Sequence, residues 1–66
     1  MRIKYKTSVY PRVADISYIE VLTPSELFFR ADGDKIRVIV PEAERILNEL
    51  LVNGYCDITA YSAKKV

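Results

Sequence analysis

The chain has 66 residues, half of them apolar, and its ten basic and nine acidic side chains give a formal net charge of +1. This length allows one domain, residues 1–66, and the near-neutral charge excludes a whole-molecule attraction to nucleic acid or to an anionic membrane. One cysteine and no histidine exclude an internal disulfide and leave no pattern of a structural zinc site. A domain this small then lacks the disulfide or bound metal that usually stabilises such domains, and we therefore expect a homodimer.

No apolar run reaches the length of a signal peptide or a membrane span, and the longest runs are residues 38–40 and 50–52. We therefore expect a soluble protein that does not contact a membrane. The lack of paired cysteines favours a reducing, cytoplasmic location.

The first third of the chain predicts two strands. Residues 2–10 alternate between mostly apolar side chains at odd positions and mostly polar or charged ones at even positions, which is typical of a half-buried strand. Pro11 would end this strand. Residues 12–15 are then a connection. Residues 16–22 are rich in β-branched and aromatic side chains but alternate imperfectly, which indicates burial of both faces or a bulge near Tyr18.

Residues 24–29 can be read as a helix or as a strand. Thr23 begins a Thr-Pro-Ser-Glu sequence with the pattern of a helix start. Alternatively, residues 27–31 and 35–40 form a β-hairpin around an Asp-Gly turn. We favour the hairpin because the alternating apolar residues of the return strand need a partner.

The strongest local signal predicts a helix over residues 41–53. Pro41 suits the first helical position, acidic residues follow it, and Gly54 is a C-terminal stop. The apolar residues form one stripe, which consists of Ala43, Ile46, Leu47, Leu50 and Leu51.

Residues 55–61 alternate as a last strand, and from about residue 62 the chain is expected to fray. The elements predict an α+β fold in the order ββββαβ. We expect one mostly antiparallel sheet of four or five strands with the helix packed on one face.

One helix covers one side of such a sheet, so each strand has a side for the core and a side for water or a partner. The expected core side carries Ile3, Tyr5, Val9, Phe29, Ile36, Val38, Cys56 and Ile58. The expected open side carries Arg2, Lys4, Lys6, Phe28, Arg30, Lys35, Arg37, Tyr55 and Tyr61. Because neighbours in a strand point to opposite sides, one of Phe28 and Phe29 is expected to be exposed or at an interface.

Tyrosine and arginine are enriched at binding hot spots. We therefore expect a small non-enzymatic protein-interaction module, such as a regulatory subunit, an accessory factor or a phage-type inhibitor. It would bind a protein through the open sheet face or an edge strand. The candidate contact residues are Phe28, Arg30, Arg37, Tyr55 and Tyr61.

The alternative function is nucleic-acid binding, because cations suit phosphates and flat rings suit unstacked bases. Its candidate residues are Lys4, Lys6, Phe28, Arg30, Lys35 and Arg37. The competing interpretation is that these cations simply solvate the sheet and protect its edges.

The sequence offers no pattern for catalysis, a cofactor or a small-molecule substrate. With no histidine and two glycines, it lacks the usual neutral-pH base and a glycine-rich phosphate loop. Cys56 falls on the core side of its strand, which favours an inert buried thiol. The Asp32-Gly33-Asp34 sequence favours a plain turn because calcium needs about six or more oxygen ligands. We assign no metal.

Overall fold

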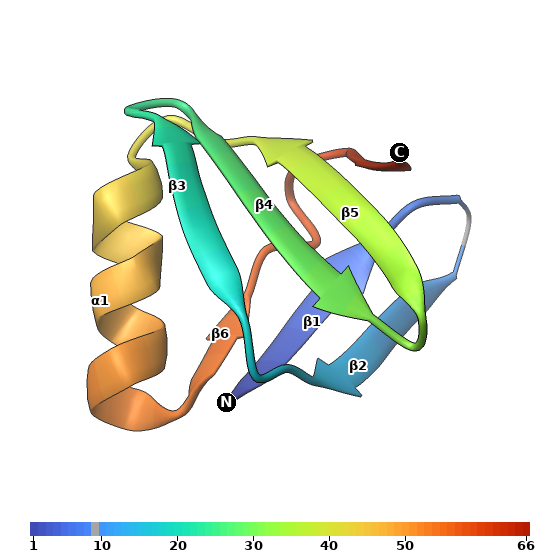
Figure 1. The fold of residues 1–66 in the computed structure, drawn as a ribbon, viewed down its shortest axis with the longest axis horizontal. Coiled ribbons are helices and arrows are strands. Elements are labelled where there is room, and N and C mark those ends of the chain that lie inside the picture. Colours follow the sequence, from blue (N-terminus) through green and yellow to red (C-terminus); the bar gives the residue numbers. More distant parts are fainter. Residues whose placement is uncertain (9) are drawn as a thin grey trace.

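A computed structural model of the chain describes residues 1–8 and 10–66, so the predicted core position Val9 lies outside the described residues. The chain has an α+β fold, as predicted, with the helix after the strands of the first part of the chain. The expectation of one sheet is wrong, because the described strands form two sheets (Figure 1).

The N-terminal sheet has the order β2-β1-β6, with β1 antiparallel to β2 and parallel to β6. Its strands are β1 (Arg2–Lys6), β2 (Pro11–Asp15) and β6 (Tyr55–Asp57). The larger sheet has the order β3-β4-β5-β7 and is antiparallel throughout. Its strands are β3 (Ile19–Thr23), β4 (Glu26–Ala31), β5 (Asp34–Ile39) and β7 (Ala63–Lys65).

The first strands differ from their predicted bounds. The first strand ends at Lys6, and the predicted connection is itself a strand, because β2 begins at Pro11 opposite Lys6. Proline is compatible with the start of an edge strand, where its missing N–H is not needed by the sheet. The bulge of β3 lies between Val21 and Thr23, rather than near Tyr18.

The strand interpretation of residues 24–29 is confirmed by β4, which forms the predicted hairpin with β5. The turn between them uses positive φ at Asp32 (52°) and Gly33 (82°), as tight hairpin turns require. Phe29 points inward and is fully buried, whereas Phe28 is partly exposed on the other side. This confirms that the two rings lie on opposite faces.

The helix α1 (Ala43–Asn53) ends where the sequence predicts and begins two residues later. Glu42 precedes it with an extended φ of −141°, and the N–H of Ala43 donates to the carbonyl of Pro24 at 3.0 Å. At the other end, Gly54 has a φ of 73° and its N–H donates to the Leu50 carbonyl at 2.9 Å. A left-handed glycine of this kind is a common helix stop.

The predicted apolar stripe of α1 is partly wrong. Ala43, Ile46 and Leu50 are buried, Leu47 is half-buried, and Leu51 is 66% exposed. The reason is the position of the helix, which lies beside β3 and β6 at one edge of each sheet (Figure 1). Contact with two edges buries a narrower stripe than contact with a broad sheet face.

The core lies between the two sheets and is closed by α1. The ring of Tyr5 from the N-terminal sheet meets that of Phe29 from the larger sheet edge to face, with centroids 5.3 Å apart. Every described residue of the predicted core side is buried. The alternation in the sequence therefore identified the inward side of the strands correctly, although they belong to two sheets.

The last part of the chain is more ordered than predicted. The strand expected over residues 55–61 ends at Asp57, and a turn leads to β7, which pairs with β5. Lys65 forms an ion pair with Asp34 at 3.2 Å, and the N–H of Val66 donates to the Lys35 carbonyl at 2.8 Å. The expectation of a frayed tail from residue 62 is therefore wrong.

Candidate interaction surface

The larger sheet has one side in the core and one side facing solvent. Its cross-strand register places the solvent-facing side chains together, and the ring of Tyr18 joins them by contact with Phe28. We call this side the outer face, and it comprises Tyr18, Glu20, Glu26, Phe28, Arg30, Lys35, Arg37, Ile39 and Lys64.

Aromatic and aliphatic side chains lie among the charges of the outer face. The rings of Tyr18 and Phe28 meet edge to face, with centroids 6.4 Å apart. The Tyr18 hydroxyl donates to Glu20 Oε2 at 2.5 Å, and this hydrogen bond raises the pKa of Tyr18. Tyr18 is 46% exposed and Ile39 is 71% exposed. The face therefore combines apolar contact area with polar groups.

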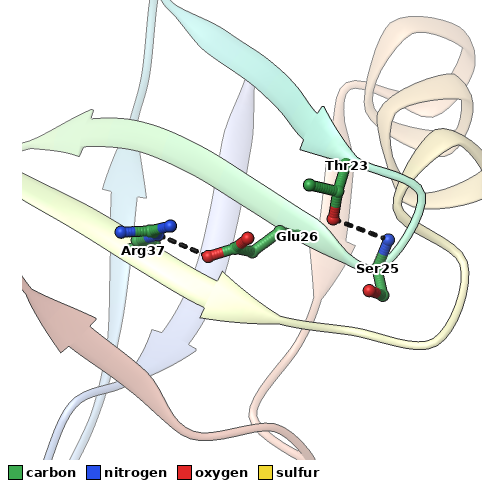
Figure 2. A network of polar contacts seen from close by, with 4 residues as sticks. All are labelled: Thr23, Ser25, Glu26 and Arg37. Carbon is green, nitrogen blue, oxygen red and sulfur yellow. Dashed lines mark hydrogen bonds and ion pairs between the residues drawn. The ribbon is translucent and has the colours of Figure 1, made fainter.

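One row of the outer face crosses all four strands. Glu20 pairs with Phe28, Phe28 with Arg37, and Arg37 with Lys64. Arg37 Nε also donates to Glu26 Oε2, which joins β5 to β4 (Figure 2). In the turn between β3 and β4, the Ser25 N–H donates to Thr23 Oγ1 at 3.2 Å (Figure 2).

The outer face is more basic than the rest of the molecule. It carries four of the ten cationic side chains and two of the nine acidic ones. Glu26 is paired with Arg37. Within residues 1–8 and 10–66, Arg30, Lys35 and Lys64 take part in no ion pair. Three cations of this face are therefore left without a carboxylate partner in the described chain.

A shallow groove of about 350 Å³ lies beside the outer face, where β5 and β7 meet. Ile39 and Val66 contribute its aliphatic part, and each is more than 70% exposed. Its polar part consists of Glu26, Arg37, Ser62, Lys64 and Lys65. Such a groove can take an apolar side chain while cations stand beside it.

The structure brings together four of the predicted site residues and separates the others. Phe28, Arg30, Lys35 and Arg37 lie on the outer face. Tyr55, Lys4 and Lys6 belong to the N-terminal sheet, whose solvent side points away from the outer face across the core. Tyr61 precedes β7 and packs partly against the core.

Five members of the outer face are not among the predicted site residues, namely Tyr18, Glu20, Glu26, Ile39 and Lys64. Tyr18 precedes β3 and reaches the face through its ring, and Lys64 lies in the segment expected to fray. Ile39 could have been found, because the alternation of β5 places it on the same side as Lys35 and Arg37.

The solvent side of the N-terminal sheet has no comparable aromatic pair among the described residues. Val13 and Tyr55 are both exposed there, but they lie on β2 and β6 at either side of β1. Arg2 and Lys4 of β1 stand between them. This side therefore lacks a continuous apolar centre.

A pocket of about 180 Å³ between α1 and β6 contains Cys56. The thiol is 6% exposed and donates a hydrogen bond to Glu49 Oε2 at 3.2 Å. Burial, followed by this hydrogen bond and the negative charge of Glu49, raises the pKa of Cys56 to about 11. The protonated thiol is a poor nucleophile and a poor metal ligand at neutral pH.

The part of the chain that the structure describes holds no group of three or more side chains suited to bind a metal ion. Nor do its residues form a helix long and apolar enough to span a bilayer. Comparison of the chain with family models, with curated proteins and with solved structures found no match in any of the three.

Proposed function

We propose that the protein is a non-enzymatic interaction module that binds a protein partner through the outer face. The observation that carries this proposal is the Tyr18–Phe28 ring pair on a solvent-facing sheet, with Ile39 exposed beside it. Tyrosine and arginine, which this face combines, are among the residues that contribute most of the binding energy at protein interfaces. On the buried side of the same sheet, the side chains already serve the core, so the outer face is the side available to a partner.

Nucleic-acid binding has less support from the same geometry. Arg37, which this alternative assigns to a phosphate, is already engaged by Glu26. Lys4 and Lys6, which this alternative uses, lie on the other sheet. A labelled single strand titrated at two salt concentrations tests it, because phosphate contacts make the affinity fall as salt rises.

Site-specific photocrosslinking in the cells that produce the protein tests the proposal. A benzophenone amino acid replaces Phe28 in one variant and Tyr55, an exposed ring on the other sheet, in a matched control. We expect a discrete crosslinked protein from position 28 and none from position 55. The added substitution Ile39→Glu is expected to remove that product.

Equal crosslinking from both positions, or none from position 28, would refute binding through the outer face. Circular dichroism and thermal melting of each variant establish that it is folded, so loss of crosslinking reports on contact. Ile39 is well suited to this test because its side chain is 71% exposed and its replacement leaves the core unchanged.

A further inference from the structure

We infer that the partner of the outer face presents an acidic segment with an aliphatic or aromatic side chain, and that this partner is not a second copy of the chain. The inference rests on the proposed function and adds the chemistry of the partner. It follows from the charges that the outer face leaves unpaired, from their arrangement, and from the symmetry of a face-to-face dimer.

The outer-face charges that take part in no ion pair among the described residues are three cations and one carboxylate, that of Glu20. Arg30, Lys35 and Lys64 make no ion pair among the described residues, whereas Glu26 is held by Arg37 and Glu20 accepts the Tyr18 hydroxyl. A partner that covers this face removes water from the three cations. Carboxylates on the partner would replace that water, whereas a neutral or basic partner would leave the cations uncompensated.

The cations flank the apolar part of the face on two sides. Arg30 and Lys35 are cross-strand neighbours beside the β4–β5 turn, and Lys64 lies on β7 next to Arg37. The groove with Ile39 adjoins this second side. An apolar side chain in the groove, with acidic residues before and after it in the same segment, would satisfy both features.

Two aligned face-to-face arrangements of a second copy place like charges together on the outer face. In a face-to-face dimer the two-fold axis lies in the plane between the sheets. An axis along the strands, between β4 and β5, would place Arg30 opposite Lys35 of the second copy, and the reverse. Four cations would then meet at one end of the interface.

The other orientation of the axis, across the strands, also brings like charges together. If it passes along the row that crosses the sheet, Arg37 meets Arg37 of the second copy, and Lys64 and Glu20 likewise meet themselves, whereas Arg30 faces Glu26 of the second copy. Like charges placed opposite each other disfavour association. We therefore expect a homodimer of this small chain to use another surface.

Selection from a phage-displayed library of random peptides of about 12 residues, with the whole protein as target, tests this inference. We expect the enriched peptides to contain more Asp and Glu than the starting library, together with an aromatic or large aliphatic residue. Their binding to the double variant Arg30→Glu/Lys35→Glu is expected to be about tenfold weaker or worse. It is also expected to weaken as the NaCl concentration rises.

The matched control is the double variant Lys4→Glu/Lys6→Glu, which changes the net charge by the same amount on the other sheet. We expect it to bind the selected peptides nearly as well as the unmodified protein. Peptides without an excess of acidic residues, or an equal loss in both double variants, would overturn the inference. So would a single-stranded oligonucleotide that displaces the selected peptides and binds more tightly than they do.

The proposed function is separated from the inference by Phe28→Ala and Ile39→Glu. If these variants abolish binding of peptides that are not acidic, the outer face is a binding surface and the inferred charge of the partner is wrong. If no selected peptide depends on either residue, or none is enriched, both fail. Sedimentation equilibrium adds a further test, since a dimer that Phe28→Ala dissociates would identify a second copy as the occupant.

Discussion

Neighbouring phenylalanines on β4 allow a direct test of the two sides of the larger sheet. Phe29 is fully buried and meets the ring of Tyr5 at a centroid distance of 5.3 Å. Replacement of a buried phenylalanine by alanine costs about 3–5 kcal/mol. A domain of this length has a total stability of roughly 3–10 kcal/mol, so Phe29→Ala is expected to unfold much of the protein. Phe29→Leu, at about 1 kcal/mol, is expected to stay folded.

Phe28 is partly exposed, and its described ring contact is with Tyr18 at 6.4 Å. Loss of such a ring pair and of partial burial costs about 1 kcal/mol. Urea denaturation followed by circular dichroism measures the free energy of unfolding of Phe28→Ala and of the two Phe29 variants. The sidedness of β4 would be refuted if Phe28→Ala destabilised the protein as much as Phe29→Ala, or if Phe29→Ala were tolerated.

Further predictions concern three local features, namely Cys56, Gly54 and the Glu26–Arg37 ion pair. Because the pKa of Cys56 is raised from 9.0 to about 11, the folded thiol is expected to react with a disulfide reagent at about pH 8 far more slowly than the denatured chain. The stability linked to this thiol is fully present below the unfolded pKa of 9.0 and is lost as the pH rises toward 11, which thermal melting across that range would detect. Gly54 has a φ of 73°, and an added Cβ meets no atom within 4 Å, so the cost of a side chain there is backbone strain alone. Gly54→Ala is therefore expected to lower the stability measured by thermal melting by about 1–2 kcal/mol. Gly54→Asn is expected to lower it less, because asparagine tolerates this conformation better, and equal losses would contradict the backbone explanation. A double-mutant cycle on Glu26 and Arg37 is expected to give a coupling of about 0.2–1 kcal/mol that decreases in about 1 M NaCl; no coupling at low salt would contradict a functional ion pair.

The local pattern of the sequence predicts which side of each strand is buried. Ile3, Phe29, Val38 and Cys56 come from four strands, and each was assigned correctly to the core. Alternation predicts the buried side correctly because successive side chains of a strand point to opposite sides, whichever sheet the strand joins. The Gly54 stop succeeds for a similar reason, since the left-handed conformation is a local property.

The division into two sheets is not encoded locally. It depends on the parallel pairing of β1 with β6, which joins Ile3 to Cys56 across most of the chain. Alternation is the same for a strand in one sheet or in two, so it does not identify the neighbour. The assignments that failed, such as Leu51 as a core residue, follow from this missing information, because a helix beside two sheet edges buries less than one on a sheet face.

The same arrangement bears on the choice between a sheet face and an edge strand as the binding surface. In the larger sheet, β3 is contacted by α1, and β7 is three residues long with two lysines. In the N-terminal sheet, β6 is also contacted by α1, and β2 begins with Pro11. Short strands, lysine, proline and coverage by a helix are the usual features that protect an edge from pairing with another chain.

An added strand would therefore meet an obstacle at each of these edges, whereas the outer face has none. Phe28 and Ile39 reach solvent there with the groove beside them, and binding at this face requires no change in strand pairing. We therefore expect Phe28→Ala to weaken partner binding far more than it weakens folding. Along β7 the N–H of Val66 bonds to β5, so by the alternation of an antiparallel ladder the N–H of Lys65 points to the free edge. A partner that instead added a strand to β7 would be blocked by Lys65→Pro and would be insensitive to Phe28→Ala, and that pair of results would decide for the edge.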